Sequence, residues 1–405
     1  MSNMKKHCEE SRYRRIIMLK KRAVFVVIVG LLFALLRYVG LHVSAGEVLL
    51  RNIFQVDMSN VGKCSAKSNI VFLKTHKTAG STVQNILMRY GLDNNLSFAL
   101  PRTGHRFQYP WYFEKGSVLQ ENTNKENTNK GNTNYNILCH HTRFHYENIR
   151  DLMPNDSVYI TVVRSPGKIF RSAFEYFQLR RKFHITKENA MEAFLDDPSY
   201  YVGRYSKTRF SRNPMFFDLG YDPHQLASEA SIRNAIDYLD RIFSLVLVSD
   251  HFEESMVLLK HTLCWDINDI TYFKLNERET NSTEELTKNV EEKIRQWNKA
   301  DSMLFDHFNR SLWEKLSQLP YNWKKELNVL QQKNKDLEAK CINTRRISSN
   351  IKDENFRFFQ PPGVSVLGIV LNDFEMQNKI CVHMAKAEVP FTQELKQMYK
   401  KSIRK

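Results

Sequence analysis

The sequence of residues 69–91 is NIVFLK-THKTAGST-VQNILMRYG, an apolar segment followed by a polar loop and a second, periodic apolar pattern. The first segment is typical of a buried strand, because a short continuous apolar run leaves no polar face. From Val83 to Tyr90 the apolar residues recur at the spacing of an amphipathic helix, which Gly91 would end. The pattern therefore predicts a strand, a tight loop and a helix in succession.

The same succession occurs twice more along the chain. Residues 157–163 (SVYITVV) and 243–248 (FSLVLV) are strand candidates, and helical apolar patterns follow them at 169–177 and 252–263. Strands that alternate with helices are joined by crossovers, which makes neighbouring strands parallel. We therefore predict the α/β fold class, with a central parallel sheet flanked by helices.

Three other regions have distinct compositions. Residues 284–340 carry helical patterns without a glycine, whereas residues 346–405 carry no pattern that can be assigned. Residues 121–134 are a polar pentapeptide repeat, ENTNKENTNKGNTN, which has no apolar face to bury. We expect this repeat to be an exposed loop insertion.

The loop after the first strand holds Lys77, Gly80, Ser81 and Thr82 directly before the helix. Backbone N–H groups and hydroxyls at a helix N-terminus point toward an anion, and a lysine neutralises it, so the loop predicts a phosphate site. It does not match the motif G-x-x-x-x-G-K-[ST], because Lys77 precedes the only glycine by three residues. The alternative is an ordinary helix start with Ser or Thr as its N-cap.

A second polar loop follows the strand at 157–163, in the sequence RSPGKIFRSAFEYF. Arg164 ends the strand, Pro166 lies in the loop, and Ser172 falls inside the following helix. An arginine and a serine placed in this way can hold a second phosphate from two sides. The alternative is that Arg164 caps a neighbouring helix.

The chain is basic, with 60 Lys and Arg against 44 Asp and Glu and a net charge of +16. Residues 1–22 carry +6, and the other 383 residues carry +10. This balance fits an anionic ligand, although a solvated surface is the ordinary explanation of diffuse charge. No nucleic-acid partner is expected, because no helix-turn-helix, zinc-finger or RNP-like pattern accompanies the charge.

An apolar run at 23–43, interrupted by Arg37, is long enough for one membrane-spanning helix. Three basic residues at 20–22 precede it, so the positive-inside rule predicts that residues 1–22 are a cytosolic tail. We interpret 23–43 as a transmembrane signal-anchor. The competing interpretation is a signal peptide that is cleaved near residue 45.

A signal-anchor would place the rest of the chain in an oxidising lumen, where disulfides form. Five cysteines follow the apolar run: Cys64, Cys139, Cys264, Cys341 and Cys381. They allow two disulfides and one free thiol, but their spacing does not reveal the pairing. Sequons for N-glycosylation, a modification of secretory proteins, begin at Asn95, Asn155, Asn281 and Asn309.

The two polar loops together resemble the 5′- and 3′-phosphate-binding segments of membrane-bound Golgi sulfotransferases. FLKTHKTAGST at 72–82 is similar to the pattern of the galactose 3-O-sulfotransferase family. Further blocks that resemble this family are CHHTRFHY (139–146), MFFDLGYD (215–222) and LLKHTLCWDINDITYFKLNER (258–278). The last block is closest to the galactosylceramide-sulfating branch of the family.

The resemblance covers about residues 69–345, and it implies a luminal sulfotransferase domain with a P-loop-like fold. A stem at 44–68 would precede this domain, and a C-terminal extension at 346–405 would follow it. The implied reaction moves a sulfuryl group from 3′-phosphoadenosine 5′-phosphosulfate to the 3-hydroxyl of terminal galactose on a glycolipid or glycoprotein. It requires no metal. The implied location is the Golgi membrane, in single-pass type II orientation, and a homodimer is an open alternative to a monomer.

The resemblance also assigns roles to residues. Lys77 would stabilise the bridging oxygen and the 5′-phosphate, and Arg164 and Ser172 would hold the 3′-phosphate. The expected donor-binding residues are Lys74, Thr75, His76, Lys77, Thr78, Ala79, Gly80, Ser81, Thr82, Arg164 and Ser172. One departure is Arg164-Ser165-Pro166, where the family usually has Arg-Asp-Pro.

The general base is expected to be a histidine, because a sugar hydroxyl must lose its proton near neutral pH. Alignment with the histidine loop of heparan sulfate 2-O-sulfotransferases favours His141 over its neighbours His140 and His145, and His76 is the second choice. A zinc site is the alternative for His141 and His145, whose spacing is i,i+4. A role in packing alone is the other alternative.

Several broader alternatives stay open at this point. The acceptor could be another glycan, such as a glycosaminoglycan, or the chain could be a non-catalytic carbohydrate-binding protein on the same scaffold. A P-loop kinase or NTPase is disfavoured by the missing motif. The block at 215–222 could line the acceptor site, or Phe216 and Phe217 could be core residues with Asp218 in a turn.

Overall fold

A computed structural model describes residues 64–119, 135–205, 209–279, 286–320 and 322–403. The expected tail at 1–22, the apolar run at 23–43, most of the expected stem and the repeat at 121–134 lie outside these residues. Within the described ranges, no helix is both long enough and apolar enough to span a membrane.

The central sheet has four parallel strands, in the order β2-β1-β3-β4. They are β1 (Ile70–Leu73), β2 (Ile137–Leu138), β3 (Val158–Val163) and β4 (Leu245–Val248). All residues of β1 and β4 are buried, which explains their continuous apolar sequences. The three predicted strands are confirmed, whereas the two-residue β2 was too short to leave a pattern.

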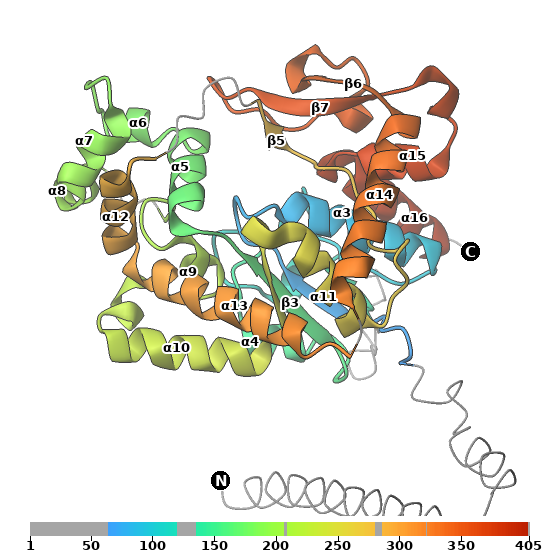
Figure 1. Cartoon of the computed structure of the whole chain (residues 1–405), viewed down its shortest axis with the longest axis horizontal. Coiled ribbons are helices and arrows are strands. Elements are labelled where there is room, and N and C mark those ends of the chain that lie inside the picture. Colours follow the sequence, from blue (N-terminus) through green and yellow to red (C-terminus); the bar gives the residue numbers. More distant parts are fainter. Residues whose placement is uncertain (1–63, 120–134, 206–208, 280–285, 321, 404–405) are drawn as a thin grey trace, which may run out of the picture. The chain divides into compact units, whose positions relative to one another are not determined.

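Helices flank this sheet, as predicted (Figure 1). The three predicted after the strands are α3 (Gly80–Asp93), α5 (Pro166–Tyr176) and α11 (Phe252–Leu263). Two others are α10 (Glu229–Ile242) and α13 (Lys299–Ser317). Both α11 and α13 contact β4, and α13 also contacts β3. The α/β fold class is therefore confirmed.

Further helices, one of them with 19 residues, complete this part of the chain. They are α4 (Tyr146–Arg150), α6 (Leu179–Lys182), α7 (Ala190–Asp196), α8 (Pro198–Arg204), α9 (Pro214–Asp218), α12 (Lys288–Trp297) and α14 (Trp323–Cys341). Helices α12, α13 and α14 confirm the helical prediction for 284–340. Apolar residues of α5, α6, α7 and α12 form a hydrophobic cluster of their own.

A second, antiparallel sheet has the order β5-β7-β6; it joins a strand from the middle of the chain to two C-terminal strands, and two helices follow them. The elements are β5 (Glu277–Arg278), β6 (Ile342–Ile347), β7 (Val366–Leu371), α15 (Lys379–Ala385) and α16 (Glu388–Ile403). The expected division between 345 and 346 falls inside β6. Helices α15 and α16 contact α3, and residues 65–405 form one compact unit.

Of the five cysteines in the described residues, four are disulfide-bonded and one is a free thiol, which agrees with the combination that the sequence allows. Cys341 is bonded to Cys381, and Cys64 and Cys264 are also disulfide-bonded. Among the described cysteines, Cys139 is the free thiol, and burial raises its pKa to about 12. A thiol that is buried and protonated is unreactive.

The strand order creates a topological switch point between β1 and β3. The chain leaves β1 to form β2 on one side, and then returns to form β3 on the other side. In open parallel sheets, ligands bind outside the carboxyl ends of the strands at such a point. The two predicted phosphate loops follow β1 and β3, so both lie at this position.

Candidate active site

The two predicted phosphate loops contact each other directly. The Arg164 guanidinium donates a hydrogen bond from Nη1 to the Lys77 carbonyl oxygen at 2.9 Å. The Ser165 backbone N–H and hydroxyl both donate to Asp250, which follows β4, at 2.8 Å each. Asp250 thereby holds the start of α5 in place, and Ser172 lies half-buried within that helix.

The start of α3 has an unusual backbone. Its N-cap is Ala79, in the left-handed conformation with φ of 68°, and Lys77 has φ of 63°. No side chain among the described residues caps this helix. The alternative of a Ser or Thr N-cap is therefore wrong, and the uncapped amide groups suit an anion.

Threonine hydroxyls of the first loop and of the start of α3 make hydrogen bonds within the protein. Thr75 Oγ1 donates to the Val162 carbonyl oxygen at 2.6 Å and lies 2.7 Å from Thr78 Oγ1. Thr82 Oγ1 accepts from the Leu275 amide at 3.3 Å. These three expected donor-binding residues therefore shape the loop through their side chains.

Gly80 is required by close packing. A Cβ atom at this position would lie 2.8 Å from Lys74 Cγ and 3.3 Å from the Thr75 carbonyl oxygen. The aliphatic stem of Lys74 thus lies against the first residue of α3.

Lys77 is a lysine held in an unfavourable electrostatic environment. Its pKa falls from 10.5 to about 7, chiefly because of burial and then because of the positive charges of Arg164, Arg278 and Lys74. Its Nζ lies 3.6 Å from the centre of the Tyr176 ring. Within the described residues, no carboxylate forms an ion pair with Lys77 or Arg164. Burial likewise lowers the pKa of Arg164, although the negative charge of Asp250 opposes this shift. A bound anion would relieve this repulsion.

Lys74 is held very differently. Its side chain is buried, and its Nζ donates to Gln84 Oε1 at 2.7 Å and to Glu388 Oε2 at 2.6 Å. The ammonium of Lys74 is therefore paired within the protein, whereas that of Lys77 is not.

Two histidines stack beside the first loop. The rings of His76 and His141 are 4.1 Å apart at an angle of 16°. His141 Nδ1 lies 2.9 Å from the Lys74 carbonyl oxygen. A carbonyl can only accept, so Nδ1 carries the proton and Nε2 of a neutral ring keeps its lone pair. Burial, with the charges of His76 and Lys74, holds the pKa of His141 well below its usual range.

His76 is anchored by a buried carboxylate instead. Its Nδ1 lies 2.9 Å from Asp218 Oδ2, and its backbone N–H donates to the same oxygen at 2.7 Å. The Tyr109 hydroxyl donates to Asp218 Oδ1 at 2.8 Å. Asp218 therefore orients His76 and could stabilise its imidazolium.

The other two histidines of the predicted cluster lie elsewhere. His140 is fully buried, with its Nε2 2.9 Å from Thr392 Oγ1, and burial lowers its pKa to about 3. His145 is the N-cap of α4, where its Nδ1 accepts from the Asn148 amide at 3.4 Å. The side chain of His141 thus lies at the first loop, whereas those of His140 and His145 contact other parts of the protein.

Comparison with known proteins identifies the family. A family model described as galactose-3-O-sulfotransferase matches residues 3–399. The chain belongs to the galactose-3-O-sulfotransferase family. This match includes the C-terminal sheet and most of α16, beyond the residues 69–345 that carry the motif resemblance.

Curated relatives of this sulfotransferase have related names. It is 35% identical over 345 residues to galactosylceramide sulfotransferase of Homo sapiens, which covers 83% of this chain and 80% of that protein. It is 36% identical over 341 residues to galactose-3-O-sulfotransferase 2 of Sus scrofa, covering 81% and 83% respectively. It is 31% identical over 340 residues to galactose-3-O-sulfotransferase 3 of Bos taurus, covering 80% and 77%.

Sequence analysis of this sulfotransferase missed some residues of the site. Asp218 was assigned to a turn or an acceptor surface, yet it ends α9 and holds His76. Phe216 is a core residue, whereas Phe217 is half-buried beneath the Arg143 guanidinium at 4.2 Å. The available signal was a lone acidic residue in an aromatic block, which is too weak to indicate a partner.

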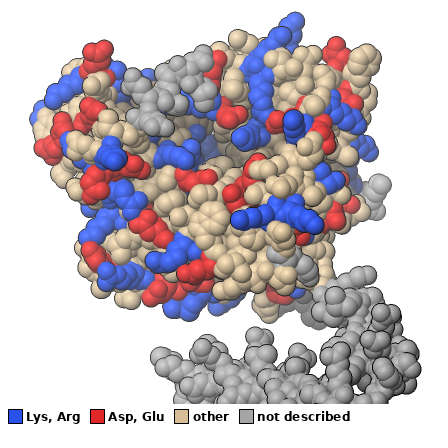
Figure 2. Space-filling view, in the orientation of Figure 1, with Lys and Arg blue, Asp and Glu red and all other residues tan. Residues whose placement is uncertain are grey.

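Two further features of the structure concern its surface charge and its candidate metal ligands. On the face shown in Figure 2, basic and acidic side chains are interspersed, as in a solvated surface. The described part of the chain holds no group of three or more His, Cys, Asp or Glu side chains suited to a metal ion.

Proposed function

We propose that this sulfotransferase transfers a sulfuryl group from 3′-phosphoadenosine 5′-phosphosulfate to the 3-hydroxyl of a terminal galactose. The observation that carries the proposal is the pair of cations Lys77 and Arg164 at the switch point, neither of which forms an ion pair with a carboxylate of the described residues. A phosphorylated donor would supply that negative charge. Similarity to galactosylceramide sulfotransferase supports a glycolipid acceptor, and a glycoprotein is the alternative.

The donor would lie across the two loops of a P-loop-like sulfotransferase fold. In this proposal the amide groups at the start of α3 and the Lys77 ammonium hold the 5′-phosphate, and Arg164 and Ser172 hold the 3′-phosphate. As the bond between sulfur and the bridging oxygen breaks, negative charge develops on the departing phosphate. Lys77 stabilises that charge, and it gains affinity for a proton as it does so.

The acceptor hydroxyl needs a base as its oxygen attacks sulfur. We assign this role to His141, whose low pKa keeps Nε2 unprotonated near neutral pH. The proton passes from the sugar hydroxyl to Nε2, and 3′-phosphoadenosine 5′-phosphate leaves. His76 is the second candidate, supported by Asp218, which would stabilise the imidazolium formed.

The location and the partners complete the proposal. Residues 23–43 would anchor the chain in the Golgi membrane, with residues 1–22 in the cytosol, 44–68 as a stem and the domain from 69 onward in the lumen. The chemistry requires no metal, because protein cations can stabilise the developing charge. A homodimer and a monomer remain the alternatives for assembly.

A transfer assay tests the reaction. The full-length chain in detergent would receive donor labelled in its sulfuryl group, with galactosylceramide, lactosylceramide, N-acetyllactosamine and a glycosaminoglycan offered in parallel. We expect label on the galactose 3-position, lost in Lys77→Ala and in His141→Ala. If His76→Ala abolishes transfer while His141→Ala keeps it, the base is His76.

The same protein distinguishes the alternative functions. Label on the glycosaminoglycan alone would change the acceptor class. Binding of 3′-phosphoadenosine 5′-phosphate without transfer to any acceptor would favour a non-catalytic binding protein. Preference for ATP over the 3′,5′-bisphosphate would overturn the proposal.

A further inference from the structure

Helix α16 presents three polar side chains to the active-site region. Glu388, Thr392 and Lys396 follow one another at intervals of four residues, so they share one face of the helix. Glu388 pairs with Lys74, Thr392 contacts His140, and Lys396 Nζ donates to the Gly104 carbonyl oxygen at 2.7 Å.

Two of these contacts lead directly to the proposed catalytic groups. The Lys74 carbonyl oxygen anchors His141 Nδ1, and the Lys74 stem packs against Gly80 at the start of the donor loop. His140, which Thr392 contacts, is the chain neighbour of His141. Glu388 therefore acts through Lys74, and Thr392 through His140, on a group that would touch donor or acceptor.

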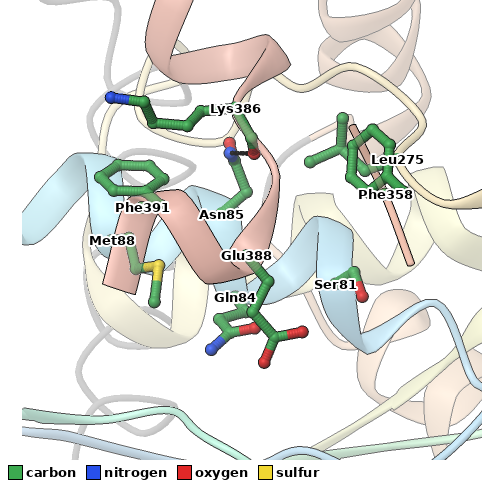
Figure 3. Close-up of a pocket in the computed structure, with 9 residues that line it drawn as sticks. All are labelled: Ser81, Gln84, Asn85, Met88, Leu275, Phe358, Lys386, Glu388 and Phe391. Atoms are coloured by element: carbon green, nitrogen blue, oxygen red, sulfur yellow. Dashed lines mark hydrogen bonds between the residues drawn. The ribbon is translucent and has the colours of Figure 1, made fainter. Parts of the chain in front are cut away.

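The junction is buried and polar. Gln84 Nε2, Glu388 Oε1 and His140 Nδ1 are buried and have no hydrogen-bond partner among the described residues. Gln84 and Glu388 both line a small cavity, and Figure 3 shows their polar ends next to each other, where α16 approaches α3. In such a place, removing one partner leaves the other charge buried and unpaired, so its neighbours must move.

We propose that α16 is a positioning element for catalysis, in which Glu388 and Thr392 set Lys74 and His140 and thereby fix the donor loop and His141. Neither side chain touches the reacting atoms, so both are positioning residues. The consequence for catalysis rests on the proposed function, whereas the effect on the geometry of His141 does not.

Helix α16 contains its own control. Glu394 is also a half-buried carboxylate of this helix, and it pairs with Lys386 and His383 rather than with a strand end. Replacing Glu394 removes a similar ion pair but leaves Lys74 and His140 in place. A purely structural role for α16 would make Glu388 and Glu394 equivalent.

The experiment compares Glu388→Met, Glu388→Gln, Thr392→Val and Glu394→Met in the full-length chain. We expect Glu388→Met to lower kcat by about 10- to 100-fold, because a small misplacement of reacting groups has an effect of this order. Glu388→Gln, which keeps an acceptor for Lys74, should recover part of the loss. Thr392→Val should lower kcat less than Glu388→Met, and Glu394→Met should stay within about twofold of the parent.

A second measurement reports geometry without turnover. The rate at which diethyl pyrocarbonate modifies His141, followed by peptide mass spectrometry, should change in Glu388→Met and not in Glu394→Met. Equal kcat and equal His141 reactivity in these two variants would overturn the inference. If the parent protein transfers no sulfuryl group to any acceptor, the proposed function fails, and the His141 reactivity still decides the positioning role.

Discussion

Lys74 and Lys77 lie three residues apart, at the two ends of one loop turn, and they are held in opposite ways. Lys74 is paired with Glu388 and Gln84, whereas Lys77 faces Tyr176, Arg164 and Arg278 without a carboxylate. A buried lysine with a carboxylate contributes to the fold. A lysine surrounded by other cations is destabilised until an anion arrives, which is the state expected of a donor-binding group.

The largest expected effect concerns the paired lysine. Lys74→Met should lower the free energy of unfolding by about 3–5 kcal/mol, because it leaves the Glu388 carboxylate buried and unpaired. Denaturant unfolding measures this loss.

The double variant Lys74→Met/Glu388→Met is the matched control. It should be more stable than either single variant, because no unpaired charge remains. Additive losses would show that the two charges do not act as a pair.

The next effect concerns the unpaired lysine. Lys77→Ala should lower kcat/KM by about 10²- to 10³-fold, because charge on the departing phosphate is no longer stabilised. This factor corresponds to a loss of about 3–4 kcal/mol in transition-state stabilisation. The stability of Lys77→Ala should not fall as that of Lys74→Met does, since removal of a repelled cation costs no ion pair. Initial rates and thermal unfolding of the two variants test this contrast, and a large loss of stability in Lys77→Ala would contradict it.

A third effect follows from the pKa of Lys77. Without donor this pKa is about 7, and a bound anion should raise it, so binding takes up a proton. Affinity for 3′-phosphoadenosine 5′-phosphate should therefore fall as pH rises above 7, by at most about tenfold per pH unit. Calorimetry in buffers of different ionisation enthalpy measures the uptake, which Lys77→Met should abolish.

The free energy of unfolding of the donor-free protein should change with pH in the direction opposite to that of the donor affinity. The folded pKa of about 7 lies below the unfolded value of 10.5, so the unfolded chain binds more protons between these values. The contribution of Lys77 to the free energy of unfolding therefore rises with pH across that window. The Lys77→Met variant should lack this contribution to the pH dependence. A contribution that falls across the window would contradict the low pKa.

The smallest effect concerns the ring beneath Lys77. Tyr176→Leu removes the aromatic face and should weaken donor binding by about 0.5–2 kcal/mol. Tyr176→Phe keeps the face and is the control. Equal losses in the two variants would assign the effect to the hydroxyl instead of the ring.

The secondary-structure elements that could be predicted are those whose sequence patterns lie within a short stretch of neighbouring residues. The segments from β1 to α3 and from β3 to α5 were predicted because apolar runs and helical spacing are local properties. The family resemblance implied that Lys77 and Arg164 act on one donor, and the structure places both residues after adjacent parallel strands. Histidines in the block at 139–146 were recognised as candidates and the alignment favoured His141, but only the structure shows that His141 lies beside the first loop.

Contacts between distant segments were not predictable in this way. Glu388 lies 314 residues from Lys74, and Asp218 lies 142 residues from His76. No sequence pattern indicates which residue an isolated carboxylate will contact, so neither pair could be predicted.

The sequence thus determined a parallel sheet with cationic loops after two of its strands, since strand and helix patterns are short-range. Only the tertiary structure decided which lysine pairs with a carboxylate and which lies beside other cations. The reason is that the pKa of a buried cation depends on charges brought close by folding, whatever their distance along the chain.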